Sequence, residues 1–144
     1  MEQKNYHSSI AAHVSPQEAF ASIANVSAWW AKNFKGKATK NGDTFRVTFG
    51  DTWVDFEIAD AIPEKQIVWK VKDCYLPWLK DKKEWNNTQV TWKISSQNGA
   101  TKVDMTHIGL VPGVECYEAC EEGWNGHVQD SLQQLLNTGK GKPE

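Results

Sequence analysis

Apolar residues recur with a helical period over the last long segment of the chain. At 100° per residue, one narrow stripe between Val114 and Thr138 carries Tyr117, Cys120, Trp124, Val128, Ser131 and Leu135, with His127 and Leu132 on its shoulders. The opposite face is polar and holds Glu118, Glu122, Gln129 and Gln133. Pro112 and Gly113 precede the segment and Gly139 follows it, as is typical of helix boundaries. The pattern predicts one long amphipathic helix over 114–138.

Gly123 interrupts the predicted helix. A Gly in a helix interior costs about 1 kcal/mol relative to Ala. Either backbone or a ligand comes close to this position, or the residue is merely tolerated there. The sequence leaves both interpretations open.

The middle of the chain alternates between apolar and polar residues, which predicts antiparallel strands with one wet face. The apolar positions are Phe45, Val47, Phe49, Val54, Phe56, Ile58, Ile67, Trp69, Val71, Val90, Trp92, Ile94, Val103, Met105 and His107. Gly50-Asp51, Pro63-Glu64-Lys65 and Asn98-Gly99 mark the turns, and Asn-Gly is the strongest short hairpin signal. A further strand over 5–14 leads to an expected sheet of about six or seven strands.

Two short helices are predicted between the first strand and the rest of the sheet. Ser15 is a helix N-cap, Pro16 occupies the first helical position, and Glu18 completes a capping box. Ala19, Phe20 and Ile23 would form the apolar face of this helix. A second cap, Ser27, would open another turn that carries Trp29 and Trp30.

The connection over 73–86 is longer than a hairpin requires. Tyr75, Leu76, Trp78 and Leu79 are more apolar than a solvated loop should be. These residues would either form a flap over a cavity mouth or cover a sheet edge or one end of the core.

Length and charge limit the classes of protein that this chain can represent. A chain of 144 residues with 40% hydrophobic content and eight Trp fits one domain over 1–144, in which 139–144 would be a flexible tail. A net charge of −2 provides no basic surface for nucleic acid. We expect no membrane span and no signal peptide. The odd number of cysteines, three, argues against a disulfide framework, and we expect a cytoplasmic protein.

Several motifs resemble one protein family. They are Thr106-His107-Ile108-Gly109-Leu110, Gly123-Trp124, the leucine-rich end over 132–139, and Ser15-Pro16 with Trp29-Trp30. With the order of elements, they make the chain similar to the family of activators of Hsp90 ATPase, in the START-related (SRPBCC, birch-pollen-allergen-like) superfamily. The resemblance implies an α+β helix-grip fold, in which a curved antiparallel sheet wraps round the long C-terminal helix. Members of this superfamily bind ligands, catalyse cyclisations or dock on partners.

Aromatic and sulfur-containing side chains from the sheet, the long connection and the helix would converge on a cavity. The candidate ligand-binding residues are Trp30, Phe49, Phe56, Trp69, Trp78, Trp92, Met105, His107, Cys120, Trp124 and Val128. For His107 a structural hydrogen-bonding role competes with ligand contact. We interpret His127 as a histidine near the surface.

Catalytic and metal sites are less well supported by the sequence. Cys116, Cys120, His127 and His107 could gather round a metal ion, but the chain has no C-x-x-C pair, and we expect no metal and no cofactor. Cys120 could act as a thiol nucleophile, although free cysteines on a helix stripe are more often small core residues. We name no catalytic residue.

Three functions follow in order of preference. The first is binding of a small hydrophobic or aromatic ligand. The second is docking on a chaperone or another protein, as the resemblance implies, although we expect no separate N-terminal chaperone-binding domain like that of the eukaryotic activator. The third is a cyclase-type enzyme, which would need a polar acid/base pair in the cavity.

Overall fold

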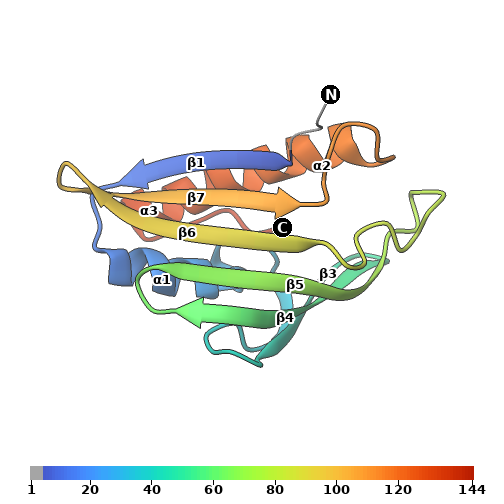
Figure 1. The fold of residues 1–144 in the computed structure, drawn as a ribbon, viewed down its shortest axis with the longest axis horizontal. Helices are drawn as coiled ribbons and strands as arrows, with labels where there is room; N and C mark the ends of the chain where they lie inside the picture. Colours follow the sequence, from blue (N-terminus) through green and yellow to red (C-terminus); the bar gives the residue numbers. More distant parts are fainter. Residues whose placement is uncertain (1–4) are drawn as a thin grey trace.

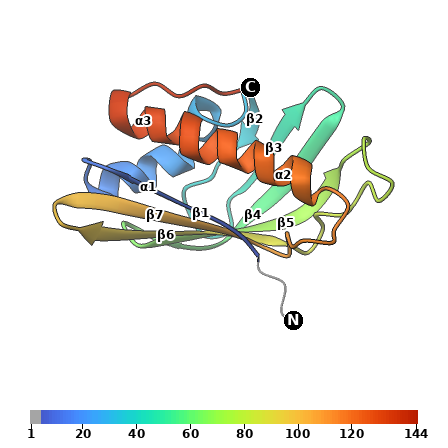
Figure 2. The same cartoon turned by 90° about the horizontal axis from the view of Figure 1, so that it is seen from above.

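Seven antiparallel strands form one curved sheet in the computed structural model, which describes residues 5–144 (Figure 1). They are β1 (Tyr6–Ala12), β2 (Asn33–Gly36), β3 (Thr44–Phe49), β4 (Thr52–Ile62), β5 (Gln66–Tyr75), β6 (Gln89–Gln97) and β7 (Ala100–Ile108), in the spatial order β1-β7-β6-β5-β4-β3-β2. The long C-terminal helix lies across one face of the sheet (Figure 2). This arrangement confirms the predicted α+β helix-grip fold. The prediction of no signal peptide rests on the first residues of the chain, and residues 1–4 lie outside the part that the structure describes.

The strands follow the alternation in the sequence. Val90, Trp92 and Ile94 of β6 are buried, and so are Val103 and Met105 of β7. The turn between these strands has Asn98 at φ 51° and Gly99 at φ 82°, as a two-residue type I′ hairpin requires. Strand β4 has two register shifts against β5. Such bulges bend a strand, and they contribute to the curvature of the sheet.

Two short helices follow β1, as predicted. Helix α1 (Pro16–Ala24) begins at the Ser15 cap, whose Oγ accepts a hydrogen bond of 3.1 Å from the backbone N of Glu18. The second is a 3₁₀ turn, η1 (Val26–Ala28), which begins after Asn25. The prediction of Ser27 as its cap was therefore wrong, because the turn starts two residues earlier.

The C-terminal helix runs without interruption through α2 (Tyr117–Trp124), the π-helical segment η2 (Asn125–Leu132) and α3 (Gln133–Thr138). It begins three residues later than the predicted Val114 because the backbone before it makes turns, and it ends as predicted at Gly139, with φ 85°.

A π-helix closes i→i+5 hydrogen bonds and has wider turns. The buried face therefore passes from Val128 to Leu132 and Leu136, and Leu135, which the 3.6-residue period placed on the stripe, is only partly buried.

Indole rings fill the space between helix and sheet. Trp29, Trp69, Trp92 and Trp124 are almost completely buried. Trp69 and Trp92 meet edge to face, with ring centroids 5.1 Å apart. Such aromatic pairs contribute about 0.5–1.5 kcal/mol beyond the area that they bury, so this cluster forms the centre of the core.

The C-terminal residues, expected to be a flexible tail, make specific contacts. The backbone N of Glu144 donates to the carbonyl O of Trp30, and the backbone N of Lys32 donates to the carbonyl O of Glu144, each at 2.9 Å. The backbone N of Lys142 donates to Ser131 Oγ at 2.7 Å. The end of the chain therefore packs along residues 30–32. Across 5–144, none of the helices has the length and apolar character needed to cross a membrane.

Candidate functional site

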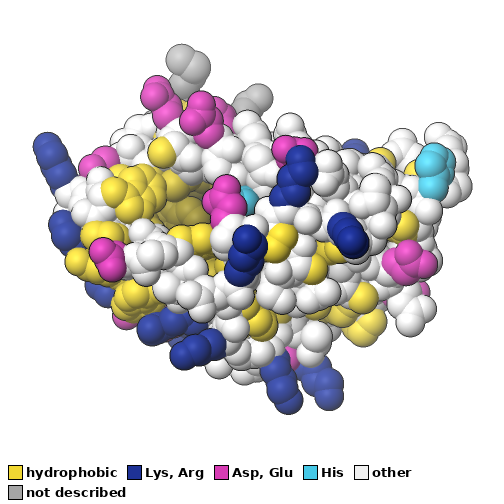
Figure 3. Space-filling view, turned by 180° about the vertical axis from the view of Figure 1, so that it is seen from behind, with side chains coloured by type: hydrophobic (Ala, Val, Ile, Leu, Met, Phe, Trp, Pro, Cys, Tyr) yellow, Lys and Arg dark blue, Asp and Glu magenta, His cyan; other side chains and the backbone are white. Residues whose placement is uncertain are grey.

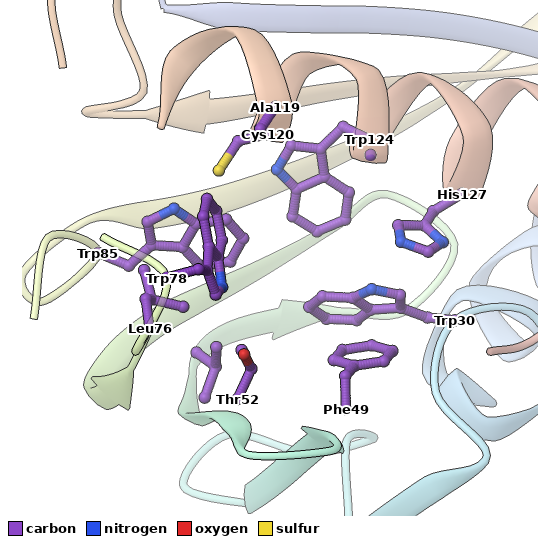
Figure 4. Close-up of a pocket in the computed structure, with 12 residues that line it drawn as sticks. Trp30, Phe49, Thr52, Leu76, Trp78, Trp85, Ala119, Cys120, Trp124 and His127 are labelled. Carbon is purple, nitrogen blue, oxygen red and sulfur yellow. The ribbon is translucent and has the colours of Figure 1, made fainter. Parts of the chain in front are cut away.

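An apolar pocket of about 140 Å³ opens where the start of the C-terminal helix faces the β3–β4 hairpin and the segment 76–88 (Figure 4). Its lining residues are Trp30, Phe49, Thr52, Val54, Leu76, Trp78, Trp85, Ala119, Cys120, Gly123, Trp124 and His127. Figure 3 shows hydrophobic side chains gathered round a hollow, with charged side chains at its edge. A cavity of about 150 Å³ accommodates benzene, so this pocket has room for about one ring.

The helix contributes one wall of the pocket through residues one turn apart. Cys120, Trp124 and His127 lie on the face directed towards the sheet (Figure 4). Gly123 has no atom within 4 Å of the position that a Cβ would occupy. Close approach of another backbone therefore does not explain the Gly. Space for a ligand and simple tolerance remain as explanations.

The opposite wall comes from the segment after η1 and from the β3–β4 hairpin. Trp30 stacks on Trp69, with ring centroids 5.9 Å apart and planes at 5°, and lies 4.9 Å from the Trp124 ring. The ring centroid of Phe49 lies 5.9 Å from that of Trp30. Because Trp30 packs against rings on several sides, its position in the pocket is fixed by the core.

The connection between β5 and β6 closes the third side, and it spans 76–88 because β5 extends to Tyr75. Leu76 and Leu79 are buried, whereas Trp78 is 52% exposed. The two alternatives for this segment therefore both apply. Leu79 covers the core and does not line the pocket, while Trp78 stands at its mouth.

Reciprocal hydrogen bonds hold this connection to the start of the helix. The Glu84 carboxylate accepts from the backbone N of Glu115 at 2.7 Å and of Cys116 at 3.0 Å. The Glu115 carboxylate accepts from the backbone N of Lys80 at 2.9 Å and of Asp81 at 3.3 Å. Four backbone donors are thereby satisfied, and the third side of the pocket is anchored to the first.

His107 lies behind Trp124 rather than in the pocket. Trp124 Nε1 donates to His107 Nδ1 at 3.0 Å, so Nε2 carries the proton and donates to Thr88 Oγ1 at 2.9 Å. Thr88 in turn donates to the Trp85 carbonyl O at 2.6 Å. Burial lowers the pKa of His107 to about 3. The ring is therefore neutral, and both of its nitrogens have protein partners, which is the structural role considered for this residue.

His127, interpreted from the sequence as a histidine near the surface, is partly exposed and also lines the pocket. Its ring lies against Trp30, Phe49 and Trp124, with centroids 6.1, 6.3 and 6.4 Å away. Burial lowers the pKa of His127, and the charge of Glu144 opposes this effect. The sequence signal that could have identified His127 as a pocket residue was its position one turn after Gly123 and beside the apolar stripe that contains Trp124.

The structure divides the candidate ligand-binding residues into two groups. Trp30, Phe49, Trp78, Cys120 and Trp124 line the pocket, whereas Phe56, Trp69, Trp92, Met105, His107 and Val128 lie in the core beyond the lining. The residues that the candidate set lacked are Thr52, Val54, Leu76, Trp85, Ala119, Gly123 and His127. Alternation along a strand predicts which side chains face the helix. It does not predict which of these side chains reach the pocket and which are covered by their neighbours.

The cysteines next to the pocket are buried thiols. Trp85 Nε1 donates to Cys116 Sγ at 3.3 Å. A hydrogen bond with Cys116, together with burial, raises the pKa of the Cys120 thiol. Cys120 is therefore protonated at neutral pH and is a poor nucleophile. Within residues 5–144, no three His, Cys, Asp or Glu side chains come together as a group that could hold a metal ion.

Solved structures of low sequence identity share this fold. The Aha1 dimer from Colwellia psychrerythraea has 23% identity and a TM-score of 0.79, over 95% of this chain and 98% of that chain. DynU16, a protein from the dynemicin biosynthetic locus, has 19% identity and a TM-score of 0.73, over 97% of this chain and 49% of its own. MLL2253 from Mesorhizobium loti has 17% identity and a TM-score of 0.70, over 91% and 96%.

No curated protein sequence matches the chain. A family match, in contrast, covers strands β2 to β7 and nearly all of α1 and of the C-terminal helix. Residues 18–137 match the family described as "Activator of Hsp90 ATPase homolog 1-like protein". The chain therefore belongs to this family, within the START-related superfamily of helix-grip folds.

Proposed function

We propose that the protein binds a small apolar or aromatic ligand in the pocket between the sheet and the C-terminal helix. The observation that carries this proposal is the lining itself. Six of the twelve lining residues have aromatic rings, and none is charged. Apolar and aromatic linings with a few polar groups are typical of small-molecule sites, and burial of one ring removes enough apolar surface to favour binding.

The anchoring of the pocket supports the same proposal. Its walls come from separate elements that are fixed by packing of Trp30 and by the hydrogen bonds of Glu84 and Glu115. A preformed site spends little of the binding free energy on ordering its side chains. A rigid one-ring ligand would therefore bind without rearrangement of the fold.

Titration with toluene, followed by NMR of the indole N–H groups, tests this function. Saturable shifts of the signals from Trp30, Trp78, Trp85 and Trp124 are expected, because all four rings line the pocket. Trp53 does not line the pocket, and its ring contacts Arg46 and Lys83 instead, so its signal is the internal control. Indole signals that do not move at saturating toluene would contradict ligand binding.

Docking on a chaperone is the second candidate, and the exposed ring of Trp78 favours it. Trp is enriched at the centres of protein interfaces, and this Trp is 52% exposed in a protein of the Hsp90-activator family. The experiment is an ATPase assay of the Hsp90-type chaperone with wild type and Trp78→Ala. Stimulation that the substitution removes would support docking, and an unchanged ATPase rate with wild type would exclude direct activation.

A further inference from the structure

The imidazole of His127 has no hydrogen-bonding partner in the part of the chain that the structure describes. Burial and the charge of Glu144 are the influences on its pKa, and no hydrogen bond contributes. His107, seventeen residues before Trp124 in the same core, uses both ring nitrogens on protein partners. The ring is only partly buried and lines the pocket, so its free nitrogens are accessible to a group that enters it.

The polar groups of the lining select for a neutral ligand. His127, Thr52 and Cys120 are the lining residues with polar side-chain atoms other than indole nitrogen, and all three are uncharged in this setting. An ionised ligand would lose hydration on entering this lining, in which none of the side chains carries a charge. A neutral imidazole, in contrast, offers one N–H donor and one N acceptor. A hydroxyl group can use either of them.

Gly123 adds space beside this imidazole. It precedes His127 by four residues, so the two positions lie on the same helix face, and both line the pocket. Its backbone is not in the left-handed region, and a Cβ would meet no protein atom within 4 Å. Neither backbone conformation nor close packing therefore requires a Gly here. The missing side chain leaves open the space beside His127, which borders this pocket and also a polar hollow that includes Gly126 and Glu144.

We propose that the pocket binds a neutral one-ring compound that carries a hydroxyl group, with the ring between Trp30, Trp78 and Trp124 and the hydroxyl hydrogen-bonded to His127. This inference rests on the proposed ligand-binding function and names the ligand class and the residue that orients the ligand. The cavity volume of about 140 Å³ limits the apolar part to about one ring.

Four probes of similar size test the ligand class by calorimetry or NMR titration at pH 7: phenol, toluene, benzoate and benzylamine. Phenol is the more hydrophilic of the neutral pair, so tighter binding of phenol requires a polar partner. A net hydrogen bond of about 0.5–1.5 kcal/mol corresponds to a phenol preference of roughly 2- to 12-fold over toluene. Benzoate and protonated benzylamine should bind more weakly than both.

His127→Phe identifies the partner. This variant keeps a ring in place but removes both nitrogens, so it should abolish the phenol preference while toluene still binds. An unchanged ratio of phenol to toluene affinity in His127→Phe, or tighter binding of a charged probe to wild type, would overturn the inference. Failure of all four probes would instead overturn the proposed function itself.

Gly123→Ala and Gly126→Ala form a matched pair for the space beside His127. Both residues are helical, and neither has an atom within 4 Å of its Cβ position, but only Gly123 lines this pocket. Ala is the better helix former, so both variants should melt at a higher temperature. Only Gly123→Ala should lower phenol affinity, by about fivefold or more. Equal phenol affinities of the two variants would contradict the role of Gly123.

Discussion

At the scale of single residues, the two histidines whose rings lie next to Trp124 have different roles. His107 is completely buried and connects Trp124 to Thr88, which fixes the indole that forms one wall of the pocket. His127 contacts Trp124 from the pocket side. The sequence identified both histidines, but it could not assign these roles, because a hydrogen bond between strand β7 and the helix depends on their relative position in space.

The pH dependence of stability tests the neutral state of His107. Its pKa is about 3 in the folded protein and about 6.5 in the unfolded chain. Between these values only the unfolded chain binds the proton, so the stability that His107 contributes is complete above pH 6.5 and is lost as pH falls towards 3. His107→Gln keeps an acceptor and a donor but does not titrate.

Urea unfolding of wild type and His107→Gln between pH 4.5 and 6 measures this effect. Carboxylates and His127 titrate in both proteins, so the difference between the two isolates His107. The free energy of unfolding of wild type relative to the variant should fall by about 1.4 kcal/mol per pH unit as the pH decreases. Parallel pH profiles would mean that His107 is already charged in the folded protein.

At the scale of elements, local signals were predictable and pairings were not. The Ser15 cap follows from four consecutive residues, and the structure has it. Strand β2 was missed because it has four residues and a single large apolar one, Phe34, and is defined by its pairing with β3. Leu135 was placed on the buried stripe because the prediction assumed 3.6 residues per turn throughout. The π-helical segment η2, which changes this period, could not be recognised from the sequence.

The Ser15 cap predicts opposite responses to two substitutions. Ser15→Ala removes the acceptor of the Glu18 backbone N–H and should lower the free energy of unfolding by about 1 kcal/mol. Ser15→Asp keeps an acceptor and adds a negative charge at the helix N-terminus, so its stability should equal or slightly exceed that of wild type. Chemical denaturation of the three proteins compares them, and equal losses in both variants would exclude capping.

The hydrogen bonds of Glu84 predict how firmly the 76–88 segment is attached to the helix. Its carboxylate accepts from two backbone donors at the start of α2, where the Cys116 side chain makes no cap hydrogen bond. Glu84→Ala leaves these donors without their acceptor and should cost about 1–3 kcal/mol.

Limited proteolysis locates the effect of this change, since the loosened segment should be cleaved faster between 76 and 88. Glu118→Ala is the control, because Glu118 is exposed in the first turn of the same helix and changes the local charge equally. Equal cleavage rates of the two variants would mean that Glu84 does not anchor the segment.

At the scale of the whole molecule, the pocket exists because distant segments meet. Trp30, Phe49, Trp78 and Trp124 come from the segment after η1, the β3–β4 hairpin, the 76–88 connection and the C-terminal helix (Figure 4). Each of these residues was a candidate from the sequence, because the resemblance to a helix-grip fold brought sheet and helix together. Cys120, the fifth candidate in the lining, also comes from the helix. The six remaining candidates are buried in the same interior but do not line the pocket, because how deep a side chain lies depends on the three-dimensional packing.

Adjacent residues of the 76–88 segment separate ligand binding from core packing. Trp78 is 52% exposed and lines the pocket mouth, whereas Leu79 is buried and does not line it. Trp78→Ala should therefore leave the free energy of unfolding within about 0.5 kcal/mol of wild type, as is usual for exposed positions. It should weaken toluene binding, because the ligand loses contact with one ring. Leu79→Ala should cost about 2–5 kcal/mol in stability.

Toluene binding to Leu79→Ala, measured under conditions where the variant is fully folded, should match wild type, since the pocket lining is unchanged. Unfolding curves and toluene titrations of the three proteins give both quantities. A large loss of stability in Trp78→Ala, with unchanged toluene affinity, would show that the Trp78 ring supports the fold rather than the ligand. The apolar hollow in Figure 3 would then be better explained as a surface for a protein partner.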